Sequence, residues 1–123
     1  LGVSAEEAEN VEVVDEVKRS IQGFYDLCRN EDYRVGLAAL FGYEKQIPEV
    51  SKVKIEGLKK FYNIDSEKAL EFFAVHHEAD IHHSKAELDA LLASCKTEEE
   101  QKNILDTVEK SAELYWQMLD GVN

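Results

Sequence analysis

Four histidines and several carboxylates lie within residues 72–91, a segment that otherwise has the composition of a long helix. At about 100° of rotation per residue, His76, Asp80 and His83 fall within an arc of roughly 60° on one helix face. The same face carries further residues before and after them, namely Ala69, Phe72, Phe73, Glu87, Ala90 and Leu91. Burying imidazoles and a carboxylate in a row is costly unless each finds a partner. Because one divalent metal ion satisfies all three groups, the spacing predicts a metal-binding face.

The other histidines of this segment have simpler interpretations. A single inward histidine is more often a hydrogen-bonded core residue than a ligand, and only the repeated spacing favours a metal. His82 is expected on the solvated face, paired with Glu78 four residues earlier. His77 lies between the predicted faces of the helix. It could support a metal ligand or lie on the surface, and we favour the surface. A second apolar face is predicted from Leu70, Ala74, Ile81, Leu88 and Leu92.

Composition places the chain among compact helical proteins. It has 123 residues, 44% of them hydrophobic, a single proline and no extended β-type alternation. We therefore expect one all-α domain over residues 1–123 that folds as a helical bundle. Cys28 and Cys95 are isolated and predict reduced thiols in a cytoplasmic protein.

Charge narrows the classes of partner. The formal net charge of −12 argues against nucleic acid and against anionic membrane surfaces. No apolar run approaches the roughly 20 residues that span a bilayer. The chain starts at Leu1 rather than at a methionine, so we expect a fragment of a larger protein.

Five or six helices must position the metal-binding face. Capping patterns and apolar spacing predict them at about residues 4–10, 13–29, 33–45, 49–62, 66–94 and 97–121. For three of them the predicted inward residues are Val14, Val17, Ile21, Phe24 and Cys28; Tyr33, Leu37, Leu40 and Phe41; and Ile104, Leu105, Val108, Ala112, Tyr115 and Leu119.

Two charged residues interrupt predicted apolar faces. Glu44 continues the inner face of the 33–45 helix, where it is either a ligand or the frayed end of a helix that reaches water. Lys54 lies at the centre of the inner face of the 49–62 helix, with Val50, Gly57, Leu58 and Phe61. A lysine there either extends its amine to solvent or is buried and reactive.

Glu44, His76, Asp80 and His83 together would provide two carboxylates and two imidazoles from two helices. Helical bundles use such ligands for iron or manganese, and mixed oxygen and nitrogen ligation suits oxygen activation better than structural zinc. Two metal ions would need about six ligands, so a second ion requires ligands from outside this set.

Three sequence motifs support a family resemblance. GYE at 42–44, VSKVKIEGLKKFY at 50–62 and EFFAVHHEADIHH at 71–83 resemble the C-terminal half of haem-oxygenase-like di-metal oxidases. They resemble in particular the para-aminobenzoate synthase group, typified by the Chlamydia protein associating with death domains. The resemblance implies a seven-helix bundle whose earlier half, with one more Glu and one more His ligand, has no counterpart in this sequence.

The resemblance also implies an activity. It points to an O₂-dependent enzyme that makes para-aminobenzoate for folate from a tyrosine of the protein itself, with iron, manganese or both as cofactor. Glu44, His76, Asp80 and His83 would bind metal, and Lys54 would donate the amino group. Tyr43 would assist electron transfer, although a plain packing role fits it equally well.

Other functions remain open at this point. A related oxidase could act on a free fatty acid or amino acid, but Lys54 would then have no evident use. A thiamin-salvage hydrolase with a cysteine nucleophile fits poorly, since neither cysteine has a suitable base nearby. A protein-interaction module with a death-domain partner is a third alternative. We also expect the missing half, or a second copy of the chain, to cover exposed apolar residues.

Overall fold

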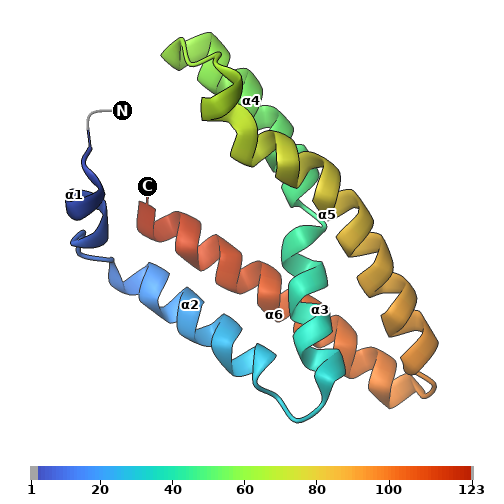
Figure 1. Cartoon of the computed structure of the whole chain (residues 1–123). Coiled ribbons are helices and arrows are strands. Elements are labelled where there is room, and N and C mark those ends of the chain that lie inside the picture. The colour runs from blue at the N-terminus through green and yellow to red at the C-terminus, as the bar shows by residue number, and fades with distance from the viewer. Residues whose placement is uncertain (1–2, 123) are drawn as a thin grey trace.

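The computed structural model describes residues 3–122, which form six helices and no β-strand (Figure 1). The predicted all-α class is therefore confirmed. The helices are α1 (Ala5–Glu9), α2 (Asp15–Cys28), α3 (Tyr33–Glu44), α4 (Ile47–Tyr62), α5 (Glu67–Ser94) and α6 (Glu98–Val122).

Local capping explains where the helices begin. Ser4 and Glu7 form the predicted capping box of α1, and the Ser66 side chain accepts a hydrogen bond from the backbone N–H of Ala69 in α5. The Thr97 hydroxyl accepts from the backbone N–H of Glu100, whose carboxylate accepts from the N–H of Thr97 in return. These hydrogen bonds join side chains at most three residues from the backbone they cap, so they were predictable from sequence.

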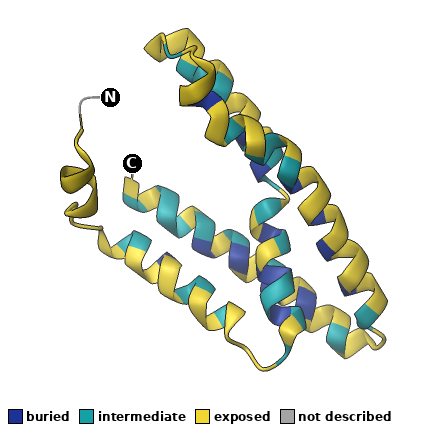
Figure 2. Ribbon diagram, in the orientation of Figure 1, coloured by how far each residue is buried: buried dark blue, intermediate teal, exposed yellow. Residues whose placement is uncertain are grey.

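The helices form two units that share α3. α2 and α6 pack on one another and on α3, while α4 and α5 form a hairpin that packs on α3 mainly through α5 (Figure 1). Buried residues concentrate where α3, α5 and α6 meet (Figure 2). The core there consists of Ala38, Leu91 and Ile104, with partly buried apolar residues around them. α3 therefore connects the two units and fixes their relative position.

α3 and α6 cross through small residues, while Ile104 of the predicted inner faces is in the core and Leu37, Phe41 and Val108 pack against it. Ala38, Ala39 and Gly42 are buried on α3, and the buried Ser111 hydroxyl of α6 donates a hydrogen bond to the carbonyl oxygen of Ala39 at 2.7 Å. A close helix crossing selects side chains small enough to let the backbones approach. The predicted inner faces were therefore wrong for Tyr33 and Leu40 of α3 and for Leu105 of α6, which are exposed.

The buried face of α5 agrees with the predicted one at Asp80, Glu87 and Leu91, but not along its whole length. Leu70, Asp80, Ser84, Glu87 and Leu91 are buried. The predicted inward residues Ala69, Phe72 and Ala90 are exposed instead, as are Ala74, Ile81, Leu88 and Leu92 of the second predicted apolar face. The reason is that, among the described helices, α5 packs mainly on α3 and α4, so one narrow face is covered.

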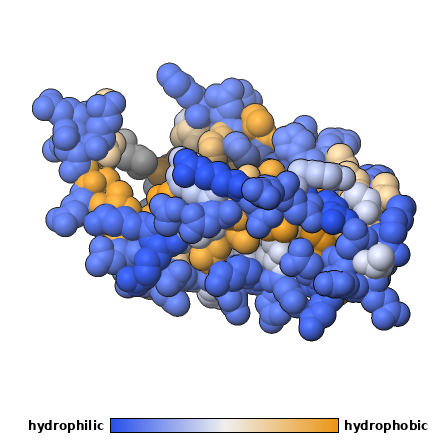
Figure 3. Space-filling view, turned by 90° about the horizontal axis from the view of Figure 1, so that it is seen from below, coloured by the Kyte–Doolittle hydropathy of each residue, from blue (hydrophilic) through white to orange (hydrophobic). Residues whose placement is uncertain are grey.

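Many apolar residues remain at the surface. On α2, Val14, Ile21 and Cys28 of the predicted inner face are exposed, and only Val17 and Phe24 are half-buried. Figure 3 shows apolar residues reaching the surface between hydrophilic side chains. An apolar cavity of about 410 Å³ lies along α2, bounded also by α3 and α6. Both cysteines are free thiols. None of the described helices is long and apolar enough to cross a membrane.

Candidate metal centre

Glu44, Asp80 and His83 come together where the end of α3 meets the middle of α5. One ligand atom from each residue lies within 4.8 Å of the others. The Nδ1 atom of His83 is 3.4 Å from Oε2 of Glu44 and 3.3 Å from Oδ1 of Asp80. Glu44 is the last residue of α3, and it is half-buried rather than extended into water. The Asp80 side chain is buried, whereas that of His83 is 60% exposed.

The electrostatics of this group favour the addition of positive charge. Burial raises the pKa of Glu44, and the negative charge of Asp80 raises it further, while His83 and His76 oppose the shift. The Oε2 atom of Glu44 is buried and accepts no hydrogen bond from the described residues. A buried carboxylate oxygen without a hydrogen bond is costly, and a cation would relieve both the desolvation and the repulsion.

Glu87 is a third carboxylate near this group, and its importance was missed in the sequence analysis. It lies four residues after His83 on the buried face of α5, and its Oε2 atom also lacks a hydrogen-bond partner among the described residues. Burial raises the pKa of Glu87 to about 7, and the charge of Glu44 adds to this effect. Its position on the same helix face as Asp80 and His83 was the signal that could have identified it.

His76 lies outside the three-residue group, but it borders the same cavity. Its Nδ1 atom is 2.7 Å from the carbonyl oxygen of Phe72. Because a carbonyl only accepts, Nδ1 is the nitrogen that donates, and in the neutral ring Nε2 is then the one free to bind a metal. Metal-binding histidines commonly have this arrangement, with one ring N–H donated to a backbone carbonyl.

A cavity of about 400 Å³ opens beside these residues. The predicted site residues Tyr43, Glu44, Lys54, His76, Asp80 and His83 all line it. Lys54 is exposed, so of the two alternatives for this residue the extension to solvent is observed, although the residue still borders the cavity. Phe61, predicted on the same inner face, is 72% exposed. Burial raises the pKa of Tyr43, and nearby Tyr115 contributes to the shift.

His77 helps to place α4 beside α5. Its Nδ1 atom donates to the carbonyl oxygen of Pro48 at 2.8 Å, and the residue is half-buried, so the predicted surface position was wrong. The interaction joins the start of α4 to the turn of α5 that carries His76. His82 is exposed as predicted, but residues 3–122 show no ion pair between His82 and Glu78.

Comparison with known proteins places the chain in a family. A family described as iron-containing redox enzyme matches residues 1–116. The chain belongs to this family. It is 36% identical over 123 residues to a 4-aminobenzoate synthase of Nitrosomonas europaea, covering all of this chain and 50% of that protein. It is 42% identical over 91 residues to one of Chlamydia pneumoniae, covering 74% of this chain and 40% of that protein.

The chain spans about half the length of these relatives. Membership of the family confirms the predicted resemblance and the haem-oxygenase-like helical fold, of which this chain represents a part. It also agrees with the donor set at the candidate centre. Carboxylate oxygens and imidazole nitrogens, without a thiolate, are the ligands that non-haem iron takes in helical bundles.

Proposed function

We propose that the complete protein is an O₂-dependent iron enzyme that produces 4-aminobenzoate. The observation that carries this proposal is the group of Glu44, Asp80 and His83, in which a buried carboxylate oxygen has no hydrogen-bond partner among the described residues. These residues fit a metal ion, and His76 presents its Nε2 atom at the same cavity. Iron bound there, alone or together with manganese, would supply the activation of O₂. Two ions would require further ligands from the part of the relatives that this chain does not span.

The residues of the chain suggest how the cavity contributes to the reaction. Lys54 and Tyr43 border it together with Glu44 and Asp80, so an amine and a phenol lie beside the proposed ligands. In the proposed reaction Lys54 supplies the nitrogen, and a tyrosine of the protein supplies the ring of the product. Phe72 and Phe73 also border the cavity and provide apolar walls for that ring.

Isotope labelling of the full-length protein tests this function. The protein would be loaded with Fe(II), or with Fe(II) and Mn(II), and then supplied with a reductant and O₂ while 4-aminobenzoate is measured by mass spectrometry. We expect product without an added substrate, carrying ¹⁵N when the protein contains ¹⁵N-lysine and ring label when it contains labelled tyrosine. Lys54→Arg should abolish the product, whereas Lys59→Arg, an exposed control on the same helix, should retain it.

A second candidate is an oxidase that acts on a small free substrate. The volume of the cavity, about 400 Å³, favours it, because a cavity of this size holds a small molecule. In that case O₂ consumption would require an added fatty acid or amino acid, and Lys54→Arg would have little effect.

We also propose that the other half of the domain covers the exposed apolar face of α2. The support is the exposure of Ile21 and Tyr25 and the apolar cavity beside them. Large exposed apolar surfaces usually mark an interface. Native mass spectrometry should show the full-length protein as less prone to self-association than residues 1–123 alone. Equal self-association would instead favour a second copy of the chain as the cover.

A further inference from the structure

Two tyrosines separate the candidate metal centre from the apolar cavity along α2. Tyr43 of α3 and Tyr115 of α6 border both the cavity beside the metal-binding group and the apolar cavity. Their ring centroids are 5.4 Å apart and the ring planes are nearly perpendicular, at 80°. This edge-to-face contact brings the two π-systems together across the wall between the cavities.

The position of each tyrosine in the chain gives the pair a direction. Tyr43 directly precedes Glu44 and is close enough to Glu44 and Asp80 to respond to their charges. Tyr115 is carried by a different helix, α6, and none of the proposed ligands is near it in the sequence. Phe24 also contacts Tyr43 edge-to-face, with centroids 6.0 Å apart, but a phenyl ring is much harder to oxidise than a phenol. The contact with Tyr115 is therefore the one that could pass an oxidising equivalent from Tyr43.

We propose that Tyr115 is a second redox-active tyrosine, which returns an electron to Tyr43 and so moves the oxidising equivalent to α6. The inference rests on the proposed function, because the oxidant is one derived from O₂. Tyr43 first loses one electron to that oxidant and releases its phenolic proton. The Tyr43 phenoxyl radical then gains one electron and one proton, while Tyr115 loses one of each and becomes the radical. No other reactant is needed for this exchange, since electron and proton are conserved between the two side chains.

Such a relay explains why the pair borders both cavities. A radical confined to Tyr43 would remain on the residue next to Glu44. After the exchange it lies on α6, where Tyr115 borders both cavities as Tyr43 does. The wall would thereby connect the oxidising site with the α2 side of the molecule without a channel between the cavities.

Electron paramagnetic resonance of the full-length protein tests the relay. The Fe(II)-loaded protein would be mixed with O₂ and frozen at successive times, with ring-deuterated tyrosine used to assign the signal to tyrosine. The key variant is Tyr115→Phe, which keeps the edge-to-face packing. The matched control is Tyr25→Phe, because Tyr25 also borders the apolar cavity while its ring contacts the Arg29 guanidinium instead.

We expect two tyrosyl components in the unaltered protein and in Tyr25→Phe, and a single component in Tyr115→Phe that decays several-fold faster or slower. An unchanged spectrum and decay in Tyr115→Phe would overturn the relay. A parallel experiment on metal-free protein would generate the radical with an external photo-oxidant, which makes the pair testable without iron. If no variant forms a radical with iron and O₂, the proposed function fails, and the photo-oxidised protein then decides the relay by the same comparison.

Discussion

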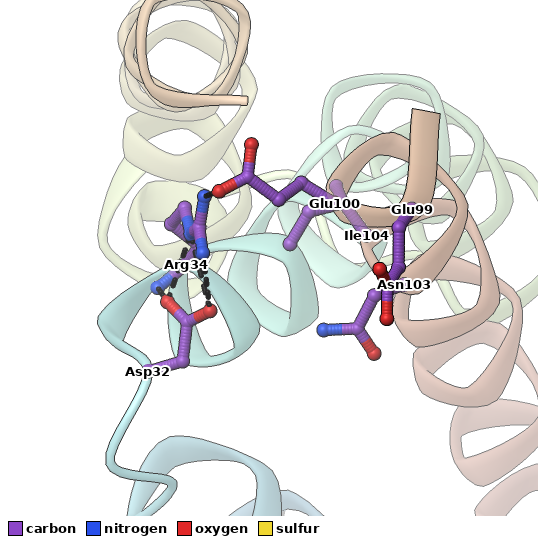
Figure 4. Close-up of a pocket in the computed structure, with 6 residues that line it drawn as sticks. All are labelled: Asp32, Arg34, Glu99, Glu100, Asn103 and Ile104. Carbon is purple, nitrogen blue, oxygen red and sulfur yellow. Dashed lines mark hydrogen bonds and ion pairs between the residues drawn. The ribbon is translucent and has the colours of Figure 1, made fainter. Parts of the chain in front are cut away.

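The two ends of α3 carry acidic groups in opposite electrostatic states. At its first turn, Arg34 binds Asp32 at 2.8 Å and Glu100 of α6 at 2.6 Å (Figure 4). It also donates to the carbonyl oxygen of Ser94. Hydrogen bonds from Arg34 lower the pKa of Glu100 to about 2 and lower that of Asp32 as well. At the other end of the helix, burial and Asp80 raise the pKa of Glu44.

The difference shows what each end requires. The Arg34 end contains its own cation, so its carboxylates are stable as anions and hold α3, α5 and α6 together. The Glu44 end offers two carboxylates and the imidazole of His83, with no lysine or arginine paired to them among the described residues. Its negative charge becomes favourable when a cation arrives from outside. The first end is organised for structure, and we propose that the second binds a metal ion.

Substitution of Glu44 should produce the largest effect and the clearest separation of the two ends. Glu44→Gln keeps the shape of the side chain but removes the charge and one metal-binding oxygen. We expect loss of iron affinity and activity of more than about 100-fold, since even residues that only support ligands cost 10–100-fold. The metal-free protein should melt at the same or a higher temperature, because repulsion from Asp80 is removed.

The control is Glu56→Gln, an exposed residue of α4, which should leave iron content and activity unchanged. Iron content and melting temperature measured on the same preparations check both parts of the prediction. Retention of iron in Glu44→Gln would show that the buried carboxylate serves only packing.

The glycines of α3 and α4 provide a second test, because only Gly42 sits where α3 crosses α6. A Cβ at Gly42 would lie 3.0 Å from the Ser111 Oγ atom and 3.1 Å from the Val108 carbonyl oxygen. A backbone oxygen cannot move aside easily, so Gly42→Ala should destabilise the protein by about 1–3 kcal/mol, less the gain in helix propensity. It should also shift Tyr43 and Glu44, which follow directly, and reduce iron binding.

Gly57→Ala is the matched control, since a Cβ there meets nothing within 4 Å. The same substitution should therefore stabilise α4 by up to about 1 kcal/mol. Urea denaturation measures whether each variant is less or more stable than the unaltered protein. A stabilised Gly42→Ala protein would mean that the two helices separate at little cost.

These tests also show which parts of the structure were predictable from sequence. Helix bounds and caps follow from interactions within a few residues, so the pattern around Ser66 was sufficient. Buried faces depend on partners distant in sequence: the crossing of α3 and α6 buries Ser111 and leaves Leu105 exposed, against its hydrophobicity. Bulk and apolarity alone could not reveal that a close crossing selects small side chains.

The candidate site divides in the same way. Asp80 and His83 share one helix face, so their proximity was predictable, and the anomaly at Glu44 was visible as a charge on an apolar face. Outside the site, the Arg34–Glu100 pair joins residues 66 positions apart and left no local signal. The sequence already placed Glu87 on the inward face of α5. Only two features distinguish it from an ordinary surface carboxylate: its buried Oε2 atom has no hydrogen-bond partner among the described residues, and its pKa is raised.

The stability of the metal-free protein should depend on pH through Glu87, which lies near the Glu44 end of α3. We expect this effect to be smaller than those of the substitutions above. The pKa of Glu87 is raised to about 7 in the folded protein, so the folded state holds this proton more tightly than the unfolded state. Stability should therefore fall as pH rises from about 4.5 to about 7. Glu87→Gln should flatten this slope, whereas Asp89→Asn, an exposed neighbour, should not. Melting temperatures across this range measure the slope, and identical slopes in all three proteins would contradict the assignment.

Glu100 should produce the smallest effect, with the opposite sign. Its pKa is lowered to about 2, so the stability it contributes is present above about 4.5 and is lost as pH falls toward 2. Glu100→Gln should lower the melting temperature at neutral pH and reduce the loss on acidification, because the ion pair with Arg34 no longer exists to be broken. Glu98→Gln, in the same first turn of α6, is the control without that pair. Glu87 should cost stability above pH 4.5, and loss of the Glu100 ion pair should cost stability below it. This result would show that the two ends of α3 differ in how their carboxylate charges are compensated, and not in how many acidic residues they contain.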